Sequence, residues 1–229
     1  RDVERSRGLG DVYKRQDVEG VPAALYDSTF SLRKDMLYYK TREYAAACRA
    51  NKMEENAMEA SKVYYTDFRC PVGTSLLDKL RRVCIAAGIK DIDMDGKFVA
   101  IKMHFGELGN LAFLRPNYAK VVADLCKEQG GLPFLTDCNT LYPGSRKNAL
   151  EHLTCAQLNG FWPMTTGCQV IIADGLRGTD EAEVPVPNGE YCKTAKIGRA
   201  IMDADIFISL THFKAVSYTH LTLPTIYSV

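Results

Sequence analysis

Hydrophobic and polar positions along the chain follow two different periods, and the changes of period predict separate strands and helices. Apolar runs typical of strands cover residues 63–68, 97–104, 132–137, 168–174 and 205–214. Between them, apolar residues recur three or four positions apart, which is the spacing of an amphipathic helix. Strands that alternate with helices of roughly ten to fifteen residues predict βαβ units. We therefore expect an α/β fold with a mostly parallel sheet and helices on both faces.

Cap and turn residues predict where the first two helices begin and end. Thr74 is the expected N-cap of a helix over residues 75–87, because a threonine hydroxyl can accept a hydrogen bond from the first turn. Pro116 suits the first turn of a second helix, which we expect to end at Glu128 before two glycines. Both helices stand between predicted strands, so they are the expected crossover helices of a parallel sheet.

The second half of the chain predicts a third helix and a hairpin. Ser145 is the expected cap of a helix over residues 145–158. Its expected apolar face consists of Ala149, Leu150, Leu153 and Ala156. A short exposed hairpin with an Asn-Gly turn is expected near residues 183–192. A helix over residues 194–202 would then lead into the last strand.

Charge and cysteine content narrow the class of protein. The 229 residues carry 29 Lys and Arg against 28 Asp and Glu, without the basic excess of a nucleic-acid binder. No apolar run reaches the roughly 18 residues of a membrane span, and the polar N-terminus lacks a secretory signal. The eight cysteines form no Cys-x-x-Cys pair, so we expect reduced, mostly buried thiols. These features predict a cytoplasmic protein that binds neither nucleic acid nor membrane.

Both ends of the chain differ in composition from its body. Residues 1–16 are charged and aperiodic, residues 216–229 are uncharged and rich in Thr, Tyr and Ser, and both resemble translated sequencing-adapter DNA. We expect them to be non-native tails. Residues 17–60 are an N-terminal extension of uncertain origin, or a genuine helical segment packed on the sheet. The expected α/β domain is therefore residues 61–215.

The stretch 97–110 carries the first candidate functional residues. It begins as a buried strand and ends as a loop that holds Lys102, His104, Glu107 and Asn110. Lys102 and His104 are two positions apart, so they lie on the same side of a strand. Ligands of open α/β sheets bind at the carboxyl ends of the strands. We therefore expect this loop to line one side of a crevice.

Three later strand ends carry polar residues of the same kinds. In residues 136–148, Asp137 ends the strand and Asn139 follows in the loop. Arg146 is expected beside a helix N-terminus, where free N–H groups and the helix dipole favour an anion. The other two strand ends hold Asp174 with Arg177, and His212 with Lys214. We expect all four strand ends to face one crevice.

These residue types suit a divalent metal or a small anion. Imidazoles with a carboxylate favour a metal, for which the predicted ligands are His104, His212 and Asp137. Lysine and arginine favour a phosphate or carboxylate. The residues predicted to bind such a ligand are Lys102, Glu107, Asn110, Asn139, Arg146, Asp174, Arg177 and Lys214. Taken singly, each could instead serve a turn or a structural hydrogen bond, and His152 is interpreted as structural.

Six motifs along the body resemble those of a known family. They are KVYYTDF, VAIKMHFGELGN, FLTDCNTLYPGSR, HLTCAQLNGF, VIIADGLRG and ISLTHFK. In this order they are similar to the domain of unknown function family 362, the uncharacterised Fe–S centre proteins, over about residues 61–214. The resemblance implies 4Fe–4S clusters only in a C-terminal, ferredoxin-like segment with closely spaced cysteines. No such segment follows here, so we expect a truncated fragment.

The functional expectation combines this resemblance with the strand-end residues. It is the α/β domain of an Fe–S centre protein in redox or electron-transfer metabolism, which binds a metal or small anion and works with a ferredoxin-like segment or redox partner. The alternative is a cluster-free, metal-assisted enzyme that acts on a small carboxylate or phosphate metabolite. The sequence contains no Walker A, dinucleotide, Gly-x-Ser-x-Gly or His-Glu-x-x-His pattern, so it predicts no particular reaction.

Overall fold

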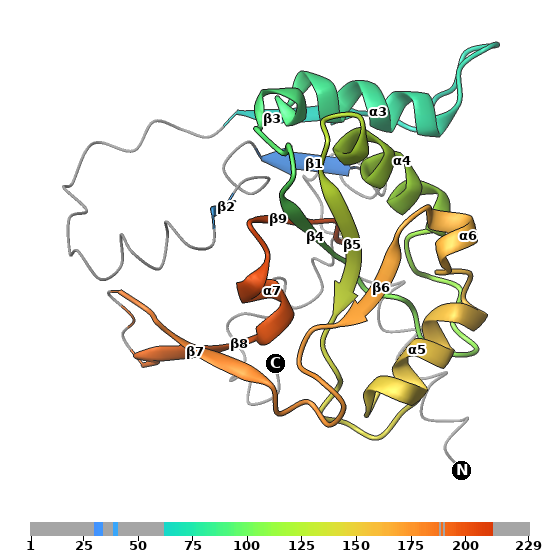
Figure 1. Cartoon of the computed structure of the whole chain (residues 1–229). Helices are drawn as coiled ribbons and strands as arrows, with labels where there is room; N and C mark the ends of the chain where they lie inside the picture. Colours follow the sequence, from blue (N-terminus) through green and yellow to red (C-terminus); the bar gives the residue numbers. More distant parts are fainter. Residues whose placement is uncertain (1–29, 34–38, 41–61, 188, 190, 213–229) are drawn as a thin grey trace, which may run out of the picture.

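The computed structural model describes residues 30–33, 39–40, 62–187, 189 and 191–212, and its centre is a five-stranded sheet (Figure 1). Across the sheet the strands stand in the order β2-β9-β4-β5-β6. Their bounds are Tyr39–Lys40 for β2, Phe98–Lys102 for β4, Leu132–Asp137 for β5, Gln169–Ile172 for β6 and Ile206–Ser209 for β9. The last four strands are mutually parallel, and β2 is antiparallel to β9. The predicted α/β fold with a mostly parallel sheet is confirmed.

Strand β4 lies inside the sheet and is apolar on both faces. Val99 and Ile101 point to one face and Ala100 to the other, and all three are fully buried. The larger hydrophobic core lies on the Val99 side, where helices α3 (Leu76–Ala86) and α4 (Pro116–Lys127) pack on the sheet. A near-continuous apolar run is typical of a parallel strand that is covered on both sides.

The connections between strands determine where the strand order reverses. The chain passes from β4 to β5 and β6 through α4 and α5 (Ala149–Leu158), and then returns past β4 to β9. Right-handed crossovers that run in opposite directions lie on opposite faces. In agreement, Ala204, directly after α7 (Arg199–Asp203), packs on Phe134 of the second face. The strand order reverses between β4 and β9, where ligands bind in open α/β sheets.

Two pairs of strands lie outside the main sheet. Strand β1 (Phe30–Arg33) pairs antiparallel with β3 (Val63–Thr66), and β7 (Glu181–Pro185) pairs antiparallel with β8 (Thr194–Gly198). The run at 63–68, predicted as the first strand of the alternating body, is therefore not a member of the parallel sheet.

Two short strands lie within the predicted N-terminal extension. Within residues 17–60, residues 30–33 and 39–40 pair with β3 and β9. Residues 1–16 and 216–229 lie outside the described residues, so their non-native origin stays a prediction.

The hairpin is present, but its second strand lies further along the chain than expected. The prediction placed a hairpin near 183–192 and a helix over 194–202, and the helix is wrong over its first part, because residues 194–198 form β8. Gly198 stands so close to β6 that a Cβ atom there would be 2.8 Å from the Cβ of Ala173. This close approach places β8 beside the end of β6. Of the predicted helix over 194–202, only the part from residue 199 onward is helical, in α7.

Helix α5 begins later than expected, and of its predicted apolar face Ala149, Leu153 and Ala156 pack on the core. Asn148 is the N-cap, not Ser145, and its side chain accepts a hydrogen bond from the Glu151 amide at 3.0 Å. The buried residues of the helix are His152, Cys155 and Ala156. Leu150, predicted to face the core, is 67% exposed. The polar His152 therefore occupies the inner face of the helix.

Helix α3 is capped one residue later than predicted. Ser75 is the N-cap in place of Thr74, since its hydroxyl accepts from the Asp78 amide at 3.1 Å and its own amide donates to the Asp78 carboxylate at 2.9 Å. Ser75→Ala is expected to lower the free energy of unfolding by about 1 kcal/mol, because the reciprocal capping bonds are lost. Thr74→Ala is the matched control and should change it by less than about 0.5 kcal/mol in urea unfolding. Equal losses in the two variants would contradict this assignment.

Candidate functional site

Four parallel strands end at one edge of the sheet, and polar residues gather there. Lys102 and Asp137 are the last residues of the neighbouring strands β4 and β5, and Asp174 follows the end of β6. Because β4 and β9 are parallel partners, His104 and His212 follow their strands at this same edge. The edge also contains the point of strand-order reversal, which makes it the candidate ligand site.

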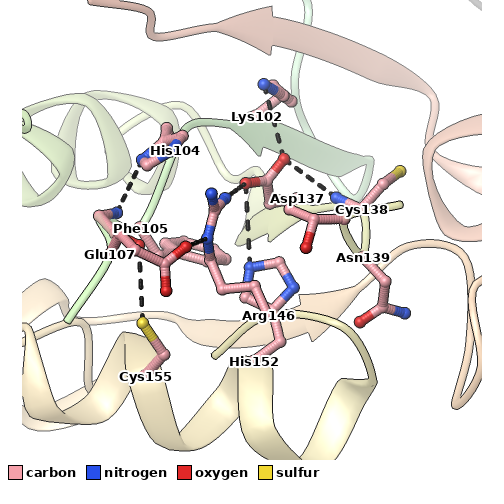
Figure 2. A network of polar contacts seen from close by, with 12 residues as sticks. Lys102, His104, Phe105, Glu107, Asp137, Cys138, Asn139, Arg146, His152 and Cys155 are labelled. Atoms are coloured by element: carbon pink, nitrogen blue, oxygen red, sulfur yellow. Dashed lines mark hydrogen bonds and ion pairs between the residues drawn. The ribbon is translucent and has the colours of Figure 1, made fainter. Parts of the chain in front are cut away.

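Asp137 is at the centre of the polar contacts drawn in Figure 2. Its Oδ1 accepts from the Cys138 amide at 3.0 Å and lies 3.5 Å from Lys102 Nζ. Its Oδ2 lies 3.6 Å from Arg146 Nη1 and 3.9 Å from His152 Nε2. Burial raises the pKa of the Asp137 carboxyl, and the positive charge of Lys102 opposes that effect. Asp137 thus connects the partly exposed Lys102 with the buried interior.

Arg146 joins the loops that follow β4 and β5. The residue is only 3% exposed, its Nε donates to Glu107 Oε2 at 3.0 Å, and its Nη2 donates to the Tyr142 hydroxyl. The prediction that Arg146 stands at a helix N-terminus is wrong, because α5 begins three residues later, at Ala149. A buried guanidinium shared by two carboxylates and a hydroxyl holds the loops together and orients Asp137.

Glu107 contacts Arg146 from the loop after β4. Its Oε1 accepts a hydrogen bond from the Ser145 amide at 3.2 Å and another from the Ser145 hydroxyl. These bonds from Ser145, and then the bond from Arg146, lower the pKa of Glu107 to about 2. Glu107 is therefore ionised at neutral pH, and its partners in the described structure are residues of the next loop.

His152 was interpreted as structural, and the structure brings it into this cluster. It is fully buried on α5, and its ring stands edge-on to Phe105 with the ring centroids 5.7 Å apart. Neither ring nitrogen has a hydrogen-bond partner in the described part of the chain. Burial, with the positive charge of Arg146, lowers the pKa of His152 to about 4, so the ring is neutral at pH 7. His152 lies three positions after Ala149 and four before Ala156, and this spacing was the signal that it faces inward.

Asn139 and Asp174 connect the loops that follow β5 and β6. The Asp174 carboxylate accepts from the Asn139 backbone amide at 3.0 Å and from its side-chain Nδ2 at 2.9 Å. The same Nδ2 donates to the carbonyl of Gly175 at 2.9 Å. These two residues, both predicted to bind a ligand, are thus brought together and hydrogen-bond each other. Asn139 Oδ1 is buried without a partner among the described residues.

The other predicted site residues lie around the cluster or outside the described part of the chain. The exposed His104 accepts the backbone N–H two residues later through Nδ1 at 2.8 Å. Asn110 likewise accepts a nearby backbone N–H at 2.8 Å. Arg177 and His212 are exposed, and Lys214 lies outside the described residues. Their ligand-binding roles stay predictions.

Side chains of the kinds that bind metal ions do not form a cluster in the described part of the chain. Among those residues, no three His, Cys, Asp or Glu side chains are placed to hold a metal ion together. The metal-binding role of His104, His212 and Asp137 stays a prediction, and the described geometry adds no support for it. All cysteines of the described residues are free thiols, as expected. None of the helices described is long and apolar enough to span a membrane.

Comparison with protein families gives a match that contains the sheet and its strand-end loops. A family model described as Domain of unknown function (DUF362) matches residues 99–224, more than half of the chain. The match begins in β4 and includes Lys102, Asp137, Arg146 and His152. No curated protein and no solved structure matches the chain.

Proposed function

The chain belongs to the DUF362 family, and we propose that its strand-end edge binds a small anionic metabolite that also carries a hydroxyl, such as a phosphate or a hydroxy carboxylate. The observation that carries this proposal is the pair of Lys102 and Asp137, whose Nζ and Oδ1 atoms are 3.5 Å apart at the ends of adjacent parallel strands. The pair lies beside the point between β4 and β9 where the strand order reverses.

Lys102 is the cation of the cluster that a ligand can reach. Its side chain is 34% exposed, whereas that of Arg146 is 3% exposed and already bonded to Glu107 and Tyr142. A lysine ammonium carries three donors, so one long contact with Asp137 leaves it able to bind an anionic oxygen. Lys102 is therefore the anion contact, and Arg146 holds Asp137 in position.

Asp137 determines which anions fit beside Lys102. An ionised carboxylate 3.5 Å from the ammonium repels an anion that has acceptors only, but it can accept a hydrogen bond from a ligand hydroxyl. Hydrogen phosphate has both a charged oxygen and an O–H group, whereas sulfate has no donor. A site built to hydrogen-bond an O–H group rejects an analogue that lacks it. We expect phosphate to bind and sulfate to bind much more weakly.

The Lys102→Met variant tests this proposal. Calorimetric titration with inorganic phosphate at neutral pH should give at least about a tenfold loss of affinity, because the charged contact is lost. Lys97→Met is the matched control, since it removes one positive charge just before the amino end of the same strand, where Lys97 pairs with Asp93. A wild-type protein that fails to bind phosphate, or equal losses in the two variants, would exclude the proposed site.

The redox role implied by the family resemblance is independent of the proposed anion binding. The domain itself was expected to work in electron transfer, with 4Fe–4S clusters only in a further segment, and no contact of the described residues bears on either expectation. The contacts that support anion binding lie within this domain, so anion binding can be tested without that segment.

A further inference from the structure

His152 is a buried polar residue whose hydrogen-bonding groups are unused in the described part of the chain. Its side chain is fully buried, and neither Nδ1 nor Nε2 has a hydrogen-bond partner there. Leaving a buried polar atom unpaired is costly, and most such groups in folded proteins are paired. The neighbouring inward residues of α5 are Cys155 and Ala156, so an apolar side chain would suit this position for packing alone.

The His152 ring is directed at one particular atom of the candidate site. Its Nε2 lies 3.9 Å from Asp137 Oδ2, beyond a hydrogen bond but close enough that a small movement would form one (Figure 2). The other carboxylate oxygen, Oδ1, is on the Lys102 side of the group, 3.5 Å from Lys102 Nζ. Catalytic and binding hydrogen bonds are often long in unliganded proteins and shorten when a ligand arrives. Each oxygen of Asp137 therefore has its own neighbours.

We propose that His152 is a positioning residue for Asp137: when a ligand lies beside Lys102, the His152 Nε2–H group donates to Asp137 Oδ2 and orients Oδ1 toward the ligand hydroxyl. This inference rests on the proposed anion-binding function and deepens it, because it adds the residue that determines how strongly the site prefers a hydroxyl-bearing anion.

The surroundings of His152 favour a neutral donor in this role. Burial and the charge of Arg146 disfavour the protonated ring, Glu107 favours it, and the ring stays neutral at pH 7. A neutral imidazole carries one N–H group, and the carboxylate side of the ring is where that proton finds an acceptor. Arg146 Nη1, 3.6 Å from the same oxygen, restrains Asp137 from a second direction.

The test uses the whole protein, inorganic phosphate, and two substitutions of one residue. His152→Leu removes the donor at similar volume, whereas His152→Gln keeps an N–H donor close to the position of Nε2. We expect phosphate affinity to fall about tenfold in His152→Leu and to stay within about threefold of wild type in His152→Gln. The preference for phosphate over sulfate should fall in parallel. Glu151→Gln, on the exposed side of the same helix, is the control and should bind phosphate like wild type.

A second measurement decides the matter even if His152→Leu does not fold. The ring 15N and N–H resonances of His152 are recorded by NMR without and with phosphate, and the Nε2–H signal should move downfield as phosphate binds. If phosphate binds but this signal does not move, or His152→Leu binds phosphate like wild type, the positioning role is wrong and the proposed function survives. If wild type binds no phosphate, the proposed function fails and the role of His152 fails with it.

Discussion

Replacing Arg146 with methionine is expected to lower the free energy of unfolding by about 3–5 kcal/mol, because removal of one partner of a buried ion pair leaves the other charge uncompensated. Arg146 is 3% exposed and contacts both Glu107 at 3.0 Å and Asp137 at 3.6 Å. Without its guanidinium, the nearly buried Asp137 keeps Lys102 as its one positive neighbour among the residues that the structure describes. The loops after β4 and β5 also lose one of the side-chain contacts that join them, while the bonds from Ser145 to Glu107 remain.

Urea unfolding of matched variants checks this expectation. Lys147→Met removes the next residue's charge, which forms an exposed i,i+4 pair with Glu151 at 3.5 Å, and should cost less than about 1 kcal/mol. Combining Arg146→Met with Glu107→Gln should cost less than the sum of the two single changes, because both remove the same interaction. An Arg146→Met variant as stable as Lys147→Met would show that the buried network contributes nothing to stability.

Acidification below about pH 4.5 is expected to destabilise the protein through Glu107. Its pKa is about 2 in the folded state, against an ordinary value of 4.5. Between these values the unfolded chain binds a proton that the native carboxylate does not, so stability is present above about pH 4.5 and is lost as the pH falls toward 2. The full shift corresponds to roughly 3 kcal/mol, and because the side chain is 30% exposed, screening by water lowers the expected loss to about 2 kcal/mol.

The Glu107→Gln variant isolates this contribution from the other carboxylates of the protein. It should be less stable than wild type at pH 6, and the difference should shrink by about 1.5 kcal/mol as the pH falls to 2.5. The measurement is the free energy of unfolding in urea at several pH values. A constant difference between the two proteins over this range would mean that the Ser145 and Arg146 contacts do not lower the pKa of Glu107 in solution.

The parallel sheet could be predicted because buried parallel strands have a strong local pattern. The bounds of β5 match the predicted run at 132–137, and the predicted runs at 97–104 and 168–174 contain β4 and β6. Strand β8 was missed because Thr194–Gly198 is short and half exposed. It becomes a strand by pairing with β7, which lies on the other side of a turn in the sequence. Weak strands of this kind are defined by tertiary pairing and not by their own composition.

The gathering of polar residues at one sheet edge could be predicted from the sequence, but the contacts among them could not. Parallel strands dictate that their carboxyl ends share an edge, so the meeting of Lys102 with Asp137 follows from the fold. The contact between Glu107 and Arg146 spans 39 positions and has no local pattern. His152 was interpreted as structural, although its spacing from Ala149 and Ala156 places it on the predicted apolar face of the helix.

We propose that the strand-end edge beside Lys102 is the ligand site. Backbone amide NMR during a phosphate titration tests it most directly, because each amide reports its own surroundings. We expect the largest shifts at Lys102, His104 and Cys138, and we expect none of them in the Lys102→Met variant. Shifts confined to α3 or to the β7–β8 hairpin, or shifts at the edge that persist in Lys102→Met, would contradict it.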